Sequence, residues 1–462
     1  MATQTLPAGT QGAPAQTAAQ DKAPAASRRE PGKTRFDVIV VGAGPAGVSA
    51  AITAAKAGLS VLILERGDYP GSKNVMGGVL YRQPTDVILP GFWREAPLER
   101  HLVEQGYWLM SERGATKFSY RGEDWDAEPY NAFTVLRARF DRWYAQQAEK
   151  AGAILVPETT VDEVLVRDGQ AVGVRVGRDQ GEIYANVVIL ADGVNSLLAK
   201  SLGLHQEWEP HTIALAVKEI IALPREKIES RFQIEGDQGV AYELLGSISK
   251  GMVGIGFLYT NKDTISIGMG CMLSDFARTG IKPYELLDQL KQHPAIKPVL
   301  AGGETREYMA HLIPEGGYNS LPKLYMGGLL VVGDAAQFVN ALTREGSNMA
   351  MISGHLAAMT AIRAHQRGDF SAASMAYYRD LLENSFILQD LRRFRKIMPF
   401  VESRHELITV YPELLAELLQ DFYTVDSVPK TQLFRRMMRK IRARRRWTSV
   451  LGDLWKGLRA LS

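Results

Sequence analysis

Residues 36–47 read FDVIVVGAGPAG, an apolar hexapeptide followed by glycines at positions 42, 44 and 47. The apolar run has the length of a buried parallel strand. The alanine-rich stretch 51–58, AITAAKAG, favours a helix after the glycine turn. In such a unit Gly42 allows a tight turn, Gly44 lets the backbone approach a pyrophosphate, and Gly47 lets the helix pack closely on the strand. We predict a dinucleotide site here; a glycine-rich loop that only packs a helix is the alternative.

A second apolar run, SVLIL at 60–64, completes a βαβ unit and ends at Glu65. An acidic residue at the end of this strand is placed to accept hydrogen bonds from ribose hydroxyls. The helix N-terminus at Pro45 and Ala46 faces the phosphates, because its unpaired N–H groups stabilise anions. Arg66, next to Glu65, is a further expected contact.

Two later strands end in acidic turns: VVILADGVNS at 187–196 and LLVVGDAA at 329–336. With these segments the chain resembles the glutathione-reductase-type FAD proteins, in the group that includes aromatic hydroxylases and geranylgeranyl reductases. The resemblance implies that Ala191, Asp192 and Gly193 lie near the pyrophosphate. It implies that Gly333 and Asp334 adjoin the ribityl chain, with Asp334 binding a ribityl hydroxyl. Alone, Asp-Gly is a common turn.

The same resemblance implies further contacts with a non-covalently bound FAD. Arg137 resembles the arginine that opens a helix and contacts FAD, with Arg139 as the substitute and a solvated helix-start arginine as the alternative. The helix that begins within TREGSN, 343–348, would direct its N-terminus at the flavin N1–C2=O edge. Alternatively Ser347 or Asn348 caps that helix, a role that is compatible with the flavin contact. The remaining implied contacts are Gly77, Gly78, Val161 and Gly346, beside Ser347 and Asn348.

The expected fold class is α/β: a glutathione-reductase-type FAD-binding Rossmann-like domain interleaved with an antiparallel-sheet α+β substrate domain, plus C-terminal helices. Residues 66–135 are expected to be rich in loops, and short strands between 212 and 270 indicate the second sheet. The expected boundaries are a disordered leader at 1–34, the FAD-binding domain at 35–210 and 323–365, the substrate domain at 211–322, a helical region at 366–429, and basic amphipathic helices at 430–462.

The segment 293–340 closely resembles electron-transfer-flavoprotein:quinone oxidoreductases and the FixC-type proteins. EGGYNSLPKL at 315–324 is its most diagnostic part, supported by KNVMGGVLY at 73–81 and YYRDLLENSFILQDLRRFRKIMPF at 377–400. The resemblance implies that electrons arrive from an electron-transferring flavoprotein, pass through FAD and reduce a membrane quinone. It also implies that NADH oxidation can be coupled to reduction of a low-potential ferredoxin or flavodoxin, which is electron bifurcation.

In one respect the chain departs from the quinone oxidoreductases, which carry a [4Fe–4S] domain. Its single cysteine, Cys271, cannot supply the several thiolates of such a cluster. FixC-type proteins leave the cluster to a separate small ferredoxin-like partner, and we expect that arrangement and no iron–sulfur cluster in this chain. One cysteine also fits a reduced cytoplasmic setting.

Flavin chemistry asks little of side chains, so we name no general acid or base. The resemblance implies a quinone region at Glu315, Gly316 and Gly317. His311 and Tyr318 bracket this turn and are candidates for quinone contact or proton transfer, although a structural histidine and a packed tyrosine are the plainer reading. None of the eight histidines forms a metal-type cluster with carboxylates, so no metal is expected.

The segment 430–462 is basic, with eleven Lys or Arg against one acid, Asp453, whereas the rest of the chain carries a net charge of −7. No run of about 18 apolar residues occurs, which argues against a transmembrane helix. Apolar residues recur at steps of three and four, and arginines and lysines lie between and opposite them. This pattern is typical of an interfacial helix on anionic lipid, and it indicates peripheral attachment to the inner face of the membrane. The apolar positions are Trp447, Val450, Leu451, Leu454, Trp455, Leu458 and Leu461, preceded by Leu433, Phe434, Met437, Met438 and Ile441; the basic ones are Arg435, Arg436, Arg439, Lys440, Arg442, Arg444, Arg445 and Arg446.

Alternatives stay open at this point. The tail could dock on a partner subunit or contact nucleic acid non-specifically, although the body is acidic and has no nucleic-acid motif. The chain could be another FAD enzyme on the same scaffold, an isoprenoid-chain reductase or a hydroxylase. It could also be a flavin-stabilised scaffold subunit.

Overall fold

The computed structural model describes residues 35–73, 77–177, 181–445 and 447–461. The expected leader at 1–34 lies outside the described residues, as do residues 74–76 of the KNVMGGVLY segment and Arg446 of the basic tail.

The predicted βαβ unit forms the centre of the first sheet. β1 (Arg35–Val41) pairs in parallel with β2 (Val61–Leu64), with Val38 opposite Val61, and on its other side with β10 (Gly181–Leu190). Within the described residues this sheet has eight strands. The others are β7 (Ile154–Val156), β8 (Val161–Arg167), β9 (Gln170–Val176), β16 (Tyr325–Met326) and β17 (Leu329–Val331).

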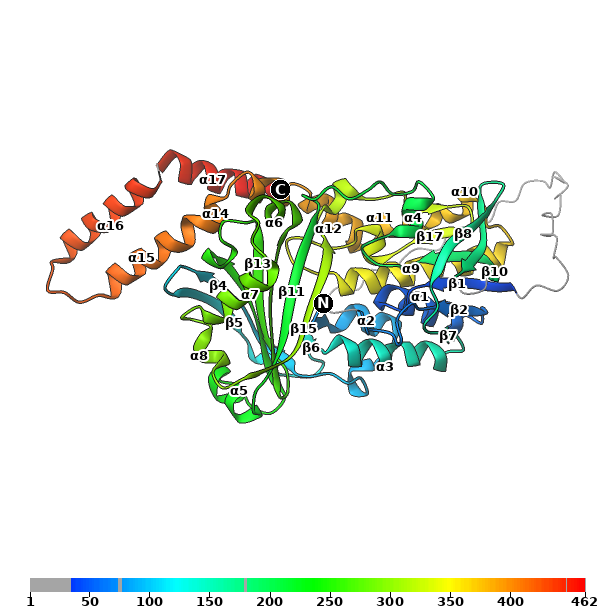
Figure 1. Ribbon diagram of the computed structural model, residues 1–462, viewed down its shortest axis with the longest axis horizontal. Coiled ribbons are helices and arrows are strands. Elements are labelled where there is room, and N and C mark those ends of the chain that lie inside the picture. Colours follow the sequence, from blue (N-terminus) through cyan, green and yellow to red (C-terminus); the bar gives the residue numbers. More distant parts are fainter. Residues whose placement is uncertain (1–34, 74–76, 178–180, 446, 462) are drawn as a thin grey trace, which may run out of the picture. The chain divides into compact units, whose positions relative to one another are not determined.

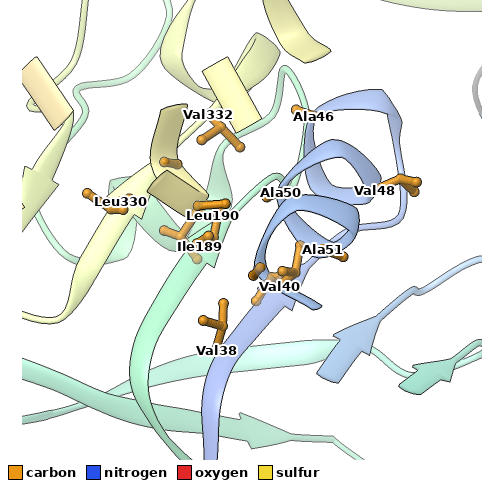
Figure 2. Close-up of a cluster of buried hydrophobic side chains, with 14 of the residues drawn as sticks. Val38, Val40, Ala46, Val48, Ala50, Ala51, Ile189, Leu190, Leu330 and Val332 are labelled. Carbon is orange, nitrogen blue, oxygen red and sulfur yellow. The ribbon is translucent and has the colours of Figure 1, made fainter. Parts of the chain in front are cut away.

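Two helices pack on this sheet and on each other: α1 (Pro45–Lys56) and α9 (Ser347–Arg367). Figure 2 shows small side chains of α1 against apolar side chains of β1 and β10. Because Ala50 and Ala51 are fully buried, the helix lies close to the strands. The mixed α/β fold is therefore built around this contact, which continues into a large apolar core.

The second sheet has nine strands among the described residues, and several of them run side by side in Figure 1. As predicted, β11 to β14 alternate in direction along the chain from 213 to 272. The region 66–135, expected to be rich in loops, supplies four more strands, so this expectation is wrong. The nine are β3 (Val79–Tyr81), β4 (His101–Met110), β5 (Ala115–Arg121), β6 (Ala132–Thr134), β11 (Ile213–Ala222), β12 (Gln238–Gly246), β13 (Gly254–Thr260), β14 (Thr264–Met272) and β15 (Glu304–Pro314).

These early strands pair partly with each other, since β4 and β5 form an antiparallel hairpin that closes at Met110 and Ala115, and partly with a strand far later in the chain. β4 pairs in parallel with β12, so that Tyr107 lies opposite Glu243. Such a pairing leaves no turn signature between the two strands.

The other helices before residue 395 cover the sheets or connect strands. They are α2 (Arg82–Ile88), α3 (Arg137–Lys150), α4 (Leu197–Ser201), α5 (Arg225–Phe232), α6 (Leu273–Thr279), α7 (Pro283–Gln292), α8 (Lys297–Leu300), α10 (Ala372–Met375), α11 (Tyr377–Glu383) and α12 (Phe386–Phe394). Short 3₁₀ helices are η1 (Phe92–Arg94), η2 (Glu123–Trp125), η3 (Ser247–Ser249), η4 (Gly317–Ser320) and η5 (Gly333–Ala336).

The chain ends in helices, as predicted for the tail, and α16 and α17 can be followed in red in Figure 1. α16 contacts α15, and α17 contacts α13. None of the described helices combines the length and apolarity that a membrane span requires. These helices are α13 (Ile397–Glu402), α14 (Glu406–Thr409), α15 (Tyr411–Tyr423), α16 (Lys430–Arg444) and α17 (Trp447–Ala460).

Candidate functional site

One cavity of about 840 Å³ joins the ends of the first sheet to one face of the second. Nearly all the residues expected to contact FAD line it, although they come from segments that are far apart along the chain. They are Gly42, Gly44, Pro45, Ala46, Glu65, Arg66, Gly77, Gly78, Arg137, Val161, Ala191, Asp192, Gly193, Gly333, Asp334, Gly346, Ser347 and Asn348.

The glycine turn has the close backbone contacts that its sequence predicts. At Gly42 φ is +103°, and a Cβ there would lie 2.3 Å from the Ala191 carbonyl oxygen. Gly47 is not among the lining residues; a Cβ on it would lie 2.0 Å from the Gly42 oxygen and 3.0 Å from a Val40 methyl. Gly47 therefore packs α1 on β1, and the start of α1 is left open to the cavity.

Glu65 holds the turn as well as facing the cavity. Its Oε2 accepts from the Ala43 N–H at 2.8 Å, and its Oε1 accepts from the Gly67 N–H at 2.7 Å. A carboxylate has about four acceptor positions, so both oxygens keep capacity for ribose hydroxyls.

Two aspartates face the cavity from the ends of β10 and β17. Asp192 Oδ2 accepts from the Leu198 N–H at 3.3 Å, whereas Oδ1 is buried without a partner among the described residues. Burial raises the pKa of Asp192 to about 6. Burial also raises the pKa of Asp334 to about 6, against the lowering effect of the Arg137 charge. A ligand that donates hydrogen bonds to these two carboxylates would stabilise their charged forms and lower both pKa values.

Arg137 is fixed by a buried ion pair within α3. Its Nε and Nη2 each donate to Asp141 at 2.8 Å, and Nη1 lies 3.4 Å from Ser347 Oγ. The substitute, Arg139, does not line the cavity and is 67% exposed. Of the two arginines, only Arg137 is therefore in position to meet a ligand in the cavity.

The start of α9 faces the cavity. Neither Ser347 nor Asn348 caps this helix, since Gly346 occupies the N-cap position without a side-chain bond. The capping alternative is therefore wrong. Asn348 Oδ1 is buried and has no partner among the described residues. The backbone N–H groups at the helix N-terminus and the side-chain oxygen of Asn348 can therefore bind a ligand.

Only part of the expected quinone region lies at the cavity. His311 and Glu315 line the cavity, whereas Gly316, Gly317 and Tyr318 do not. Tyr318 instead contacts Arg392, whose guanidinium lies 5.4 Å from its ring. Burial and then the charges of Arg137 and Arg66 lower the pKa of His311 to about 4, so the ring is neutral at neutral pH. Burial and then Asp334 raise the pKa of Glu315 to about 7.

Two groups of lining residues were missed from the sequence. One is apolar and comes mainly from the second sheet and the C-terminal helices, and we call it the apolar arm: Ala214, Val253, Met272, Ile313, Ile397, Met398, Val401 and Ile408. The other is polar, and we call it the polar cluster: Tyr81, Gln105, Tyr107, Glu243 and Arg344. Tyr81 and Arg344 lie within segments that the sequence singled out, as do Ile313, Ile397 and Met398 of the apolar arm. Nothing local marked the others.

The cavity suits FAD on its own features. It includes a glycine turn and a helix N-terminus, and it carries buried oxygens without partners among the described residues. Its lining also continues past the expected flavin contacts into the apolar arm and the polar cluster.

Two family models match the chain. The model for FAD dependent oxidoreductases matches residues 37–201, and the model for the ETF-QO/FixC family C-terminal domain matches residues 397–462. The second match covers α13 to α17.

Curated relatives match over nearly their whole length. Protein FixC of Bradyrhizobium diazoefficiens is 48% identical over 429 residues, which is 92% of this chain and 99% of the relative. The probable electron transfer flavoprotein-quinone oxidoreductase YdiS of Escherichia coli is 44% identical over 430 residues, again 92% and 99%.

Solved structures share the fold. A geranylgeranyl bacteriochlorophyll reductase-like protein from Thermoplasma acidophilum superposes with a TM-score of 0.70 at 22% identity, covering 92% of this chain and all of that one. The flavin-dependent brominase Bmp2 gives a TM-score of 0.63 at 16% identity, covering 89% and 100%.

Proposed function

The chain belongs to the ETF-QO/FixC family of FAD-dependent oxidoreductases, and on that premise we propose that it takes electrons from an electron-transferring flavoprotein and passes them to a membrane quinone. The observation that supports this most is the single cavity with an apolar arm beside the expected flavin site. A quinone with an isoprenoid chain needs such an arm, because an apolar tail is stable in a binding site only where apolar side chains shield it from water.

We propose these roles for the residues that would hold FAD. The α1 N-terminus at Gly44 to Ala46 binds the pyrophosphate, Glu65 the ribose, and Asp334 a ribityl hydroxyl. The N-terminus of α9 stabilises negative charge at the N1–C2=O edge. FAD, when bound, accepts and releases one or two electrons. Arg137 orients the site through its hold on Ser347.

We propose that a small ferredoxin-like [4Fe–4S] protein works with this chain, in a system capable of bifurcation. The sequence contains one cysteine, Cys271, which is buried, and burial raises the pKa of its thiol to about 12. A thiol of this kind stays protonated at neutral pH and is a poor metal ligand. A cysteine-bound cluster in the pathway would therefore come with another chain.

We propose that α17 attaches the protein to an anionic lipid surface. The apolar stripe at Leu451, Leu454, Trp455 and Leu458 is exposed, each side chain by 57% or more. The opposite side of the helix is held by buried Asp453, which pairs with Arg404 at 3.0 Å and Arg445 at 2.7 Å. An apolar face turned outward is typical of an interfacial helix.

α16 supplies less free charge, and less apolar surface, than the tail sequence predicts. Of the seven expected basic residues that the structure describes, four form ion pairs: Arg436 with Asp426, Lys440 with Asp421, Arg444 with Glu417, and Arg445 with Glu406 and Asp453. Among its expected apolar positions Leu433 is buried, and Phe434 is the one that is exposed. The proposed lipid contact therefore rests mainly on the α17 stripe.

Purification with spectra tests the proposal. We expect the FAD of this chain to be bleached by NADH only when electron-transferring flavoprotein subunits are present, and to be reoxidised by quinone. Bleaching by NADPH alone, with oxygen uptake on adding an aromatic acid, would indicate a hydroxylase instead. If no donor reduces the flavin, the result would favour the role of a flavin-stabilised scaffold subunit.

A further inference from the structure

The polar cluster in the lining of the cavity contains none of the residues expected to contact FAD. Arg344 lies in the loop before α9, two residues from Gly346, and reaches across to the second sheet. Its Nη2 donates to Glu243 of β12, and the same nitrogen lies 3.5 Å from the hydroxyl of Tyr107 on β4. Tyr81 of β3 donates to Gln105 at 3.1 Å in the same group.

One buried donor of Arg344 has no partner among the described residues. This donor is the Nε–H, whereas Nη2 is occupied by Glu243. Leaving a buried donor of a charged group unpaired costs free energy, so such a donor indicates a missing acceptor. Burial lowers the pKa of the guanidinium, which still stays a cation at neutral pH.

The loop holds Arg344 in this position by local bonds. Its backbone has φ +56°, a left-handed conformation that is unfavourable for a residue with a Cβ. Asn340 stabilises the turn, because its side-chain oxygen accepts from the Leu342 N–H at 3.0 Å and its carbonyl accepts from the Arg344 N–H at 2.7 Å. A strained backbone conformation of this kind persists only where the surrounding structure holds it, and such residues are frequent at ligand-binding sites.

The charges around Arg344 limit what the acceptor can be. Glu243 already neutralises the guanidinium, and Glu345 adds a second carboxylate in the same loop. An anionic ligand would be repelled by both carboxylates. A neutral molecule with a carbonyl oxygen would accept from Nε without breaking the ion pair.

Another part of the same cavity is apolar. Met398 and Val401 of α13 line the apolar arm, while Phe400 of the same helix approaches Gly457 of α17, where a Cβ would lie 3.5 Å from the Phe400 ring. The apolar arm therefore lies next to the helix that carries the exposed stripe. A carbonyl head group would match Arg344 and a hydrocarbon tail would match the α13 side chains, both of which line this one cavity.

We infer that Arg344 binds the head-group carbonyl of an isoprenoid quinone through its Nε–H, and that Glu243 is the positioning residue that keeps the guanidinium in place. This rests on the proposed function, because it assigns residues to the quinone of that reaction. Tyr107 supports the site from β4, with its ring 5.8 Å from the guanidinium carbon.

The test measures affinity, not turnover, on oxidised holoenzyme. Two 1,4-benzoquinones with the same head, one with a methyl and one with a ten-carbon side chain, are titrated while the flavin absorption spectrum is followed. Arg344→Gln should raise the Kd of both quinones by about 10-fold to 100-fold, as expected for losing one hydrogen bond from a charged donor. Met398→Ser should weaken only the long-chain quinone. The exposed Arg113→Gln is the matched control and should leave both Kd values unchanged.

A double-mutant cycle tests the positioning role. Glu243→Gln should raise both Kd values in the wild-type background and add nothing in the Arg344→Gln background, because it acts through Arg344. Glu243→Asp, which keeps the ion pair, should recover most of the affinity.

The outcomes separate the two ideas. If the wild-type holoenzyme binds neither quinone, the proposed quinone function fails. If it binds both and Arg344→Gln binds them equally well, the inference alone is overturned. Should Arg344→Gln lose its flavin, Glu243→Gln decides, and an unchanged Kd there overturns the inference.

Discussion

The carboxylates around the cavity show how single residues prepare it for a ligand. Asp192, Asp334 and Glu315 come from three segments, and burial raises the pKa of each. Burying such groups without donors costs free energy, which a ligand with hydroxyl groups returns on binding. These buried carboxylates therefore lower the free energy of unfolding of the flavin-free protein, and FAD binding raises it again.

Asp334→Ala should weaken FAD binding while leaving the fold intact. One hydrogen bond to a charged acceptor contributes about 1.5–3 kcal/mol, so the Kd for FAD should rise about 10-fold to 100-fold. The flavin should then be lost on gel filtration, which the ratio of flavin absorbance to protein absorbance measures. Asp124→Ala, at an exposed position, should keep its flavin. Full occupancy in the Asp334 variant would show that the ribityl contact is elsewhere.

Glu315→Gln should remove a pH dependence from the stability of the flavin-free protein. Burial and the charge of Asp334 raise the pKa of Glu315 from 4.5 to about 7. A carboxyl whose pKa rises on folding stabilises the folded state at low pH, and this contribution is lost as the pH rises from 4.5 through 7. Across that interval the wild-type apoprotein should therefore lose more free energy of unfolding than the variant, as measured by urea denaturation.

The exposed Glu304 on β15 provides the control for that experiment. Glu304→Gln should keep the wild-type slope of stability against pH. A Glu315→Gln slope equal to that of the wild type would contradict the assignment.

Among the helices, α17 is arranged unusually for a globular protein. Its polar and small residues, Asp453 and Ala460, are buried, whereas its leucines are exposed. Asp453 accepts from Tyr411 at 2.7 Å and pairs with Arg404 and Arg445, so an ionic network fixes the orientation of the helix. Because the buried side is held by ion pairs, the apolar side is left for another surface.

Leu454→Glu should weaken binding to vesicles that contain anionic lipid. A buried leucine contributes about 1.5–3 kcal/mol, so the partition coefficient should fall about 10-fold to 100-fold in a flotation assay. Lys456→Gln changes the net charge by the same amount outside the apolar stripe and should cost only about 1 kcal/mol. Deleting 430–462 should abolish binding with FAD retained. Vesicle binding that survives the deletion would make the tail a docking element for a partner.

In the molecule as a whole, the cavity exists because two helices approach each other closely. α1 and α9 both begin at its wall, and they meet where Gly354 contacts Ala46. A Cβ on Gly354 would lie 1.9 Å from the Ala46 carbonyl oxygen. The fold can therefore tolerate no side chain at that point without moving one helix and, with it, one wall of the cavity.

Gly354→Val should lower both thermal stability and FAD affinity. Overpacking costs about 1–3 kcal/mol, which shifts Tm by several degrees, and the displaced α1 should bind the pyrophosphate less well. Tm measured with and without saturating FAD separates the two effects. Gly452→Ala on α17, where an added Cβ meets nothing within 4 Å, should not lower Tm. A Gly354 variant with wild-type Tm and flavin content would contradict this account of the helix contact.

Much of the first sheet was predictable, because the sequence signals for its strands and turn are local. FDVIVV, the glycine turn and SVLIL follow one another directly between positions 36 and 64, and each carries its own structure. The helices of the tail were also predicted from local periodicity, and the structure confirms them. The strands between 79 and 134 were missed, and their place in the second sheet depends on the pairing of β4 with β12, which lies far later in the chain.

The sequence by itself determined the dinucleotide-binding unit, the resemblance to the ETF-QO/FixC family and the amphipathic pattern of the tail, because glycine conformation, side-chain periodicity and charge act between near neighbours. Only the tertiary structure decided that α13 and α14 line the cavity, that Arg344 meets Glu243 across it, and that four of the seven described basic residues expected on the tail are paired with acids. These contacts join side chains that are distant along the chain. Their geometry follows from how the sheets and helices pack, which no local pattern of residues specifies.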